Sequence, residues 1–318
     1  MQRFILTVGP SLLNEVPLTD VHSERNIYRI NGAHGDIADI EAYVKKIRSQ
    51  VPDADILMDL PGNKVRTKNL DKGIVLEKGK EFVIKNENFN YADFYRHLQP
   101  GMTAWANDSI FEFEVVEAGP EEIKFLSKSD GVLISNKGVH VRGIHDEMPF
   151  LFEKDKQLIE LANQYGLDFA GLSFVRTAED VKEAKGMLNN KTQVISKIET
   201  IDAVKNINEI LPLVKFILVD RGDLSTDISI EKVPRYQRFS IEKALFYDVR
   251  VFLATQVLKN METKPIPTIG EIEALYEIYK SGAYGVQMSE ETAVGKYVKE
   301  CVDMLYKMEK EVMTESIL

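Results

Sequence analysis

Two acidic residues each follow an apolar run that is typical of a buried strand, and a lysine accompanies the first of them. Glu199 closes V-I-S-K-I-E, Asp223 follows F-I-L-V-D-R-G, and Lys197 comes two residues before Glu199. Because strand side chains repeat every second residue, Lys197 and Glu199 should face the same way. Such a group can hold a divalent cation and stabilise negative charge on a phosphorylated or enolic acid. A surface ion-pair network is the alternative, but the apolar runs favour a site.

The composition narrows the class of protein. Of 318 residues, 50 are Asp or Glu and 40 are Lys or Arg, so the net charge of −10 argues against nucleic-acid or anionic-membrane partners. Small-molecule or protein partners are favoured instead. Cys301 is the only cysteine, which excludes a disulfide framework within one chain and makes the cytoplasm the expected compartment. No apolar run approaches the roughly 20 residues of a membrane span.

Short apolar runs alternate with amphipathic segments along most of the chain. The candidate strands are Phe4–Val8, Ile27–Asn31, Ile56–Leu60, Phe169–Phe174, Gln193–Glu199, Phe216–Val219, Val251–Thr255 and Gly285–Ser289. Near-continuous apolar strands separated by helices predict an all-parallel closed barrel, the (β/α)8 TIM barrel of the α/β class. A doubly wound open sheet is the alternative fold.

One stretch breaks the alternation of strands and helices. Between about residues 67 and 137 the chain has short runs such as F-E-F-E-V-V-E-A and E-E-I-K-F-L-S, separated by turn residues. These runs are typical of antiparallel strands. We therefore expect a small β-rich domain at 67–137, inserted after the third barrel strand, with the barrel formed by 1–66 and 138–318.

Polar residues gather where the predicted strands end. In a barrel of this kind the C-terminal strand ends meet at one mouth, where the chemistry is found. Positive charge from Arg29, Arg66 and Lys197 beside the two acids suits a phosphate bridged to a metal. The residues expected at the mouth are Arg29, Asn31, His34, Asp59, Arg66, Ser173, Arg176, Lys197, Glu199, Asp223, Thr255, Gln256, Ser289 and Glu291.

With these residues in place, the sequence resembles the pyruvate kinase family over nearly its whole length. The matching motifs, in the family's order, are T-V-G-P at 7–10, R-I-N-G-A-H-G at 29–35, D-L-P-G-N-K-V-R-T at 59–67, S-N-K-G-V at 135–139, S-F-V-R-T-A-E-D-V at 173–181, I-S-K-I-E at 195–199, R-G-D-L at 221–224, A-T-Q-V-L at 254–258 and S-E-E-T-A-V-G-K at 289–296. The family inserts a lid domain at the expected place. Its C-terminal domain is expected to be missing, because the sequence stops at the eighth helix.

The resemblance implies transfer of a phosphoryl group from phosphoenolpyruvate to ADP, which yields pyruvate and ATP. Glu199 and Asp223 would hold Mg²⁺ or Mn²⁺. Lys197 would neutralise charge on the phosphoryl group in flight and on the enolate. Arg29 would grip the phosphoryl group from the far side.

The resemblance also implies roles for residues around this centre. Thr255, with Ser289 behind it, resembles part of the path that delivers a proton to the enolate. The residues expected to bind the substrate are Lys197, Gly222, Asp223 and Thr255. The residues expected to bind ADP or ATP are Pro10, Asn31, His34, Arg66, Lys137 and Asp108.

The sequence departs from the family at the expected monovalent-ion site. Ala33 replaces the Ser that would join Asn31 and Asp59 in binding potassium, and Lys64 replaces a Glu of potassium-dependent members. An ammonium group can supply the positive charge that potassium would bring. We therefore expect that potassium is not required.

Further departures surround the expected substrate. Asp220 stands where the family has Ala, and Ser225 and Glu290 replace glycines. A carboxylate at position 220 would repel an anionic substrate unless a cation compensates or it turns away into a salt bridge. The alternatives are therefore a metal-dependent lyase or aldolase acting on a pyruvate enolate, and a non-catalytic binding protein. The oligomer is expected to be smaller than a tetramer, with a homodimer as the candidate.

Overall fold

The computed structural model describes residues 1–107, 110–141, 143–144 and 147–315. Its contacts divide the chain into two compact units, one formed by Met1–Pro61 with Glu153–Leu318 and the other by Gly62–Phe152. The second unit is longer on both sides than the insertion expected at 67–137. The reason is packing, since Val65 and Phe152 both contribute buried side chains to its core.

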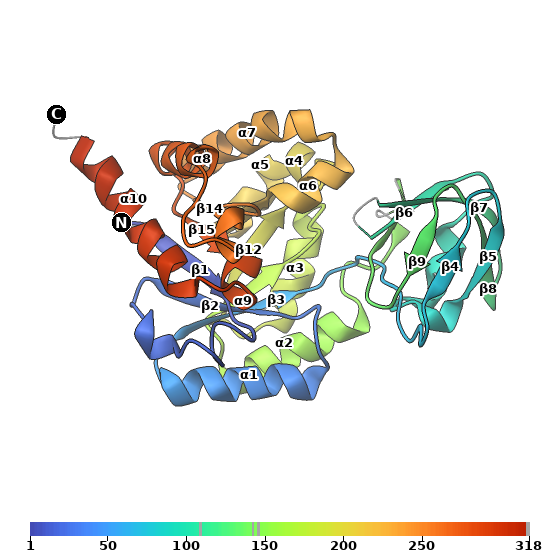
Figure 1. Cartoon of the computed structure of the whole chain (residues 1–318), viewed down its shortest axis with the longest axis horizontal. Helices are drawn as coiled ribbons and strands as arrows, with labels where there is room; N and C mark the ends of the chain where they lie inside the picture. Colours follow the sequence, from blue (N-terminus) through green and yellow to red (C-terminus); the bar gives the residue numbers. More distant parts are fainter. Residues whose placement is uncertain (108–109, 142, 145–146, 316–318) are drawn as a thin grey trace. The chain divides into compact units, whose positions relative to one another are not determined.

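The first unit is a closed barrel of eight parallel strands (Figure 1). Its strands are β1 (Arg3–Thr7), β2 (Asn26–Asn31), β3 (Asp55–Leu60), β11 (Phe169–Leu172), β12 (Gln193–Ile198), β13 (Phe216–Asp220), β14 (Arg250–Ala254) and β15 (Gly285–Met288). The order around the barrel is β1-β15-β14-β13-β12-β11-β3-β2, and β1 pairs with both β15 and β2. The predicted TIM barrel is confirmed, and the open-sheet alternative is wrong because the sheet closes.

Helices cover the outside of the barrel (Figure 1). The helices are α1 (Ile37–Gln50), α2 (Glu153–Tyr165), α3 (Ala178–Met187), α4 (Ile201–Lys205), α5 (Ile207–Ile210), α6 (Arg221–Asp227), α7 (Val233–Phe246), α8 (Ile269–Lys280), α9 (Glu290–Ala293) and α10 (Val298–Glu315). Helices α1, α3 and α8 begin with a capping box, and their N-cap residues are Asp36, Thr177 and Thr268. In a capping box the N-cap side chain accepts from the backbone N–H three residues later, and the side chain of that later residue accepts from the N-cap N–H.

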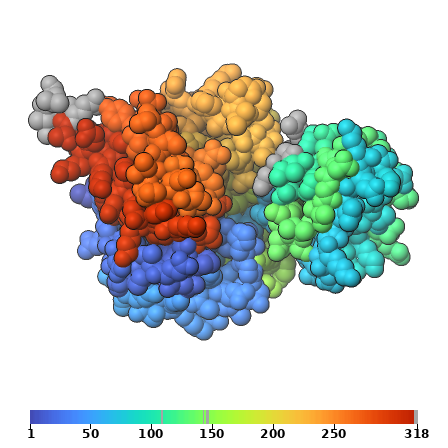
Figure 2. All heavy atoms as spheres, viewed as in Figure 1, coloured from blue at the N-terminus to red at the C-terminus, as the bar shows by residue number. Residues whose placement is uncertain are grey.

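The last two long helices, α8 and α10, pack against each other on the outer surface, where Figure 2 shows them side by side in orange and red. None of the described helices is both long and apolar enough to cross a membrane.

Inward-facing side chains form an apolar layer inside the barrel. Aromatic rings dominate it, with the Phe216 ring 5.6 Å from that of Phe169 and 6.2 Å from that of Phe252 between centroids. The guanidinium group of Arg250 lies 4.8 Å from the ring centroid of Tyr284, which packs against this layer. The apolar layer consists of Ile5, Ile27, Leu57, Phe169, Ile195, Phe216, Leu218, Phe252 and Ala254.

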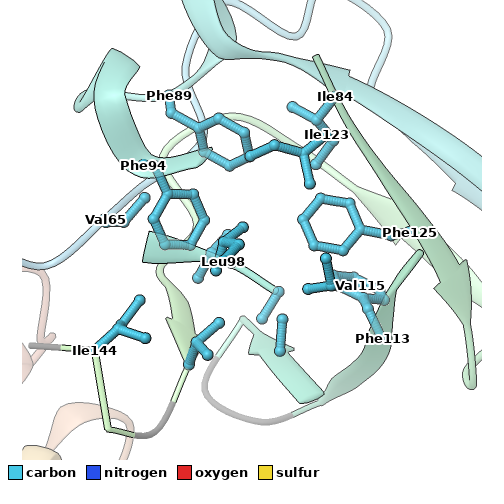
Figure 3. Packing of buried hydrophobic residues seen from close by; sticks show 14 of the residues in the cluster. Val65, Ile84, Phe89, Phe94, Leu98, Phe113, Val115, Ile123, Phe125 and Ile144 are labelled. Atoms are coloured by element: carbon cyan, nitrogen blue, oxygen red, sulfur yellow. The ribbon is translucent and has the colours of Figure 1, made fainter. Parts of the chain in front are cut away.

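The second unit is built from antiparallel strands, as the sequence predicted. A five-stranded sheet has the order β10-β6-β7-β8-β5, and β4 pairs with β9 in a two-stranded sheet. Its buried phenylalanines and aliphatic side chains converge in Figure 3, which gives this unit a core of its own. The strands are β4 (Ile74–Leu76), β5 (Glu81–Lys85), β6 (Thr103–Ala106), β7 (Phe111–Ala118), β8 (Glu122–Ser127), β9 (Gly131–Leu133) and β10 (Val139–Val141).

Candidate active site

Strand periodicity places charged side chains directly beyond the apolar layer. On β12, Ile195 belongs to the apolar layer and Lys197 is the next residue on the same face. On β13, Asp220 follows Phe216 and Leu218 in the same way. The two strands pair in parallel with Lys197 opposite Leu218, so their charged ends meet at the C-terminal mouth of the barrel.

Lys197 lies at the centre of this charged group and is 5% exposed. Its Nζ donates to Ser173 Oγ at 2.9 Å and lies 3.1 Å from Glu199 Oε2, 3.7 Å from Asp59 Oδ2 and 3.8 Å from Asp220 Oδ2. Burial alone would lower the pKa of Lys197, but the carboxylates of Asp59, Glu199 and Asp220 outweigh it and raise this pKa above its usual range. Lys197 therefore stays a fixed ammonium group.

Glu199 is fully buried and incompletely satisfied. Its Oε1 accepts from the backbone N–H of Phe174 at 2.7 Å, whereas its Oε2 has the Lys197 ion pair but receives no hydrogen bond. Burial raises the pKa of Glu199 to about 8, and the nearby carboxylates of Asp223 and Asp220 add to the effect. A buried carboxylate in this condition needs either a proton or another cation.

The residues present fit a divalent cation. One oxygen from each of Glu199, Asp220 and Asp223 lies within 4.8 Å of the others. Carboxylate oxygens are the ligands that Mg²⁺ and Mn²⁺ prefer. A cation held among them would also satisfy the open oxygen of Glu199.

Asp220 faces into the site. The sequence had left open whether its carboxylate would do so or turn away into a salt bridge elsewhere. Its Oδ1 accepts from Thr255 Oγ1 at 2.6 Å and from the Gly222 N–H at 3.1 Å. Thr255 has a φ of +73°, a strained conformation for a β-branched residue and one found mostly where function requires it. A Cβ atom at Gly222 would lie 2.9 Å from Thr255 Cγ2, so glycine allows the threonine to approach.

Arg29, on β2, is held rigidly between the neighbouring strands β1 and β3. Its Nε donates to Asp59 Oδ2 at 2.7 Å and its Nη1 to Thr7 Oγ1 at 2.9 Å, while the Thr7 hydroxyl donates to the Met288 carbonyl at 2.7 Å. Arg29 is 8% exposed. The ion pair with Asp59 fixes the guanidinium group before any ligand binds.

A cavity of about 610 Å³ opens beside Arg29 within the barrel unit. Pro10, Asn31 and His34, three of the predicted nucleotide ligands, line it together with Ser289. The structure adds residues that sequence reasoning missed, namely Asn14, Tyr43 and Lys46. The only sequence signal for Tyr43 and Lys46 is their spacing, since residues three apart share one face of α1.

Other predicted residues are placed less directly. The Ser289 N–H donates to Glu291 Oε2 at 2.9 Å, so Ser289 and Thr255 are each bonded to a different acid. Lys64, Arg66 and Lys137 belong to the Gly62–Phe152 unit, and Asp108 lies outside the described residues. The nucleotide roles of Arg66, Lys137 and Asp108, and the role of Lys64 as a substitute for the monovalent ion, stay predictions.

Two further departures from the family have local effects. The Ser225 hydroxyl donates to the Gly222 carbonyl at 2.7 Å, inside the first turn of α6. Glu290 begins α9 and is exposed.

Comparison with known proteins decides the family. The family model described as pyruvate kinase, barrel domain, matches residues 2–302. The chain belongs to the pyruvate kinase family. Among its relatives are the pyruvate kinases of Thermotoga maritima, 33% identical over 97% of this chain and 70% of the relative, and of Thermococcus litoralis, 32% identical over 97% and 69%. The pyruvate kinase of Borreliella burgdorferi is 31% identical over 98% of this chain and 68% of the relative.

Membership in the pyruvate kinase family supports a kinase as the class of enzyme. The chain spans between 68% and 70% of the length of these three relatives. The match covers the motifs that carry Arg29, Lys197, Glu199 and Asp223, which the barrel brings to one mouth. The resemblance seen in the sequence is confirmed at the level of the family.

Proposed function

We propose that the chain transfers a phosphoryl group from phosphoenolpyruvate to ADP, yielding pyruvate and ATP, and that the reaction depends on a divalent cation. The observation that carries this proposal is the buried Lys197 ammonium among the carboxylates of Glu199, Asp220 and Asp59, with Arg29 fixed beside it. Transfer of a negatively charged phosphoryl group requires positive charges that are held in place before the reaction begins.

Each residue of the group has a part in this proposal. Glu199 and Asp223 would hold Mg²⁺ or Mn²⁺, which supplies positive charge to the phosphoryl and enolate oxygens when bound. Lys197 neutralises the charge that develops during transfer, because its ammonium group is buried and already oriented by Ser173. Arg29 binds the phosphoryl group through its guanidinium group.

The enolate left after transfer needs a proton. We propose that Thr255 forms part of the path that delivers it: the hydroxyl, hydrogen-bonded to Asp220 Oδ1 in the structure, would pass a proton to the enolate carbon and take one from solvent in its place. Ser289 would support the path from the neighbouring strand end. Gly222 and Asp223, at the start of α6, would bind the substrate beside them.

ADP would bind in the cavity next to Arg29. Pro10, Asn31 and His34 line this cavity, and the Tyr43 ring and Lys46 ammonium suit a flat base and a phosphate group. The resemblance also assigns nucleotide binding to Arg66, Lys137 and Asp108, and assigns to Lys64 the charge that potassium would supply; these roles are part of the proposal. We also propose that the enzyme works in the cytoplasm.

The decisive test measures both products in one assay. Purified protein with phosphoenolpyruvate, ADP and Mg²⁺ or Mn²⁺ should release pyruvate and ATP in equal amounts, and a chelator should stop both. Controls omit ADP or the cation. The matched control variant Glu179→Gln removes an exposed surface carboxylate of α3 and should react like the wild type.

The same assay separates the two alternative functions. Pyruvate formed from a substrate without nucleotide would indicate a lyase or aldolase that uses the enolate-stabilising group alone. Cation and phosphoenolpyruvate binding without turnover would indicate a non-catalytic binding protein. Either result would refute the proposed function.

A further inference from the structure

Asp220 shares the site of the two acids that the sequence assigns to the cation. One oxygen each of Glu199, Asp220 and Asp223 lies within 4.8 Å of the others. Glu199 is 0% and Asp220 9% exposed, so these charges are largely removed from water. Carboxylates this close repel one another strongly unless a cation lies between them.

The orientation of Asp220 is fixed by two hydrogen bonds to a single oxygen. Oδ1 accepts both from Thr255 Oγ1 and from the Gly222 N–H, which leaves Oδ2 on the side of Lys197, 3.8 Å from Nζ. A ligand oxygen that is already held in place loses little freedom when it binds a cation.

An independent observation points to a cation at this position. Glu199 Oε2 is completely buried and receives no hydrogen bond, although a buried carboxylate oxygen normally has a donor. The charges agree in sign, because Glu199, Asp220 and Asp223 carry three negative charges when ionised and the Lys197 ammonium group that faces Glu199 and Asp220 carries one positive charge. A cation held among the three carboxylates would offset this excess of negative charge.

We propose that Asp220 is a third carboxylate ligand of the divalent cation, so that the protein binds this cation firmly before any substrate arrives. The inference rests on the proposed function in that it concerns the same cation and takes phosphoenolpyruvate as the acid that binds beside it. Three carboxylates around one divalent cation leave a net negative charge at the site. The same residue therefore strengthens cation binding and weakens the attraction for an acid such as phosphoenolpyruvate.

These two effects have opposite signs, and a merely structural role would not produce them. Asp220→Asn keeps an oxygen that can accept from Thr255 and Gly222 but removes the charge. Without substrate, it should weaken Mn²⁺ binding by about tenfold or more. At saturating Mn²⁺, it should tighten phosphoenolpyruvate binding several-fold, because one negative charge fewer faces the substrate.

The experiment is a Mn²⁺ titration of the full chain, followed by electron paramagnetic resonance or calorimetry, with circular dichroism as the check on folding. Glu179→Gln, which removes an exposed carboxylate of α3, is the matched control and should leave Mn²⁺ affinity unchanged. An affinity within twofold of the wild type in Asp220→Asn would overturn the proposal.

If that variant fails to fold, the wild type alone still tests the proposal. Phosphoenolpyruvate should change its Mn²⁺ affinity by less than about threefold, because the protein already supplies three ligands. A tightening of about thirtyfold or more would overturn the proposal. Neither titration requires turnover, so firm Mn²⁺ binding without ATP formation would refute the proposed function and leave this inference standing.

Discussion

The apolar layer and the charged mouth of the barrel are made by the same strands, two residues apart. Ile195 and Lys197 on β12 and Leu218 and Asp220 on β13 are successive residues on one face, yet one belongs to the packed interior and the next to the charged group. The apolar layer is stabilised by contact area, which has no preferred direction. The charged mouth depends on individual partners at fixed distances.

This difference predicts how each region responds to change. Loss of a ring from the apolar layer removes contacts and leaves a cavity, whose cost falls on the stability of the whole unit. Loss of a charge from the mouth leaves the charges of its partners buried and unbalanced. This change should appear first in the affinity for ligands and in the reaction rate. Substitutions in the two regions should therefore change different measured quantities.

The largest effect is expected for Lys197→Met. The methionine has a similar length but no charge, so phosphoryl transfer should fall by about 10³-fold or more because Lys197 acts on charge developing in the transition state. Mn²⁺ binding should survive, since the carboxylates remain. Steady-state kinetics and a Mn²⁺ titration of the same preparation provide the measurement.

Lys205→Met is the matched control for this variant, because Lys205 lies on the exposed surface of α4 and pairs with Asp202. It should retain the wild-type rate. A Lys197→Met protein that keeps more than about a tenth of the wild-type rate would remove Lys197 from the mechanism.

Phe216→Ala tests the other side of the comparison. Phe216 is 2% exposed and packs against Phe169 and Phe252, so its loss should lower the free energy of unfolding by about 3–5 kcal/mol. Mn²⁺ affinity should stay within about twofold of the wild type. Urea denaturation and the Mn²⁺ titration measure the two quantities.

Phe246→Ala serves as its control, because Phe246 is 82% exposed at the end of α7 and should cost less than about 0.5 kcal/mol. If Phe216→Ala lost cation affinity while keeping its stability, the two regions would not be separable in this way.

A smaller effect is expected from pH in the absence of divalent cations. The pKa of Glu199 is raised from 4.5 to about 8 in the folded chain, so the folded state holds a proton that the unfolded state has released. The stability that this proton provides is full below pH 4.5 and is lost as the pH rises through 8. Urea denaturation of the chelator-treated protein should therefore show stability falling across this range.

Saturating Mg²⁺ should flatten this dependence, because the cation replaces the proton at the carboxylates. Glu199→Gln should flatten it as well, which isolates the contribution of Glu199 from that of other acids. The opposite result would be a metal-free wild type that gains stability relative to Glu199→Gln as the pH rises from 5 to 8. It would show that Glu199 is ionised in the folded chain without a cation.

The barrel could be predicted from the sequence because its strands are buried on both faces. Runs such as F-I-L-V and V-F-L-A are apolar throughout and bounded by turn residues, so their positions are encoded locally. Lys197 could be placed for a similar reason, since a period of two within β12 sets its direction, and Glu199 directly follows the last residue of that strand. The inserted unit was recognised but its limits were not, because Val65 and Phe152 join its core through distant contacts.

The orientation of Asp220 could not be read from the sequence. It depends on Thr255, which lies 35 residues further along the chain, and on the left-handed backbone that brings the threonine hydroxyl to Oδ1. Tyr43 and Lys46 were missed because a Tyr and a Lys on a helix are ordinary surface residues until a cavity is seen beside them. Local patterns thus predicted the strands, while contacts between strand ends decided the details of the site.

The smallest expected effect concerns monovalent cations at the mouth. The oxygens expected to bind potassium are reduced in number, since Ala33 has no hydroxyl and Asn31 Oδ1 already accepts from the Ala33 N–H at 3.1 Å. Asp59 Oδ2 accepts from Arg29, which leaves Asp59 Oδ1, buried and without a hydrogen bond, as the open oxygen. Activity should therefore be nearly equal in sodium, potassium and tetramethylammonium salts. The ionic strength must be matched between the salts, because bulk screening affects phosphate binding by itself. The rate of ATP formation in the three salts is the measurement.

Two variants sharpen this last prediction. Lys64→Glu alone should weaken nucleotide binding and restore little response to potassium, because Ala33 offers no hydroxyl ligand. Lys64→Glu combined with Ala33→Ser should restore more, since it returns both a negative charge and an oxygen. Stimulation of the wild type by about tenfold or more in potassium over tetramethylammonium, roughly 1.4 kcal/mol of coupling, would show that the reaction needs a monovalent cation that Lys64 does not replace.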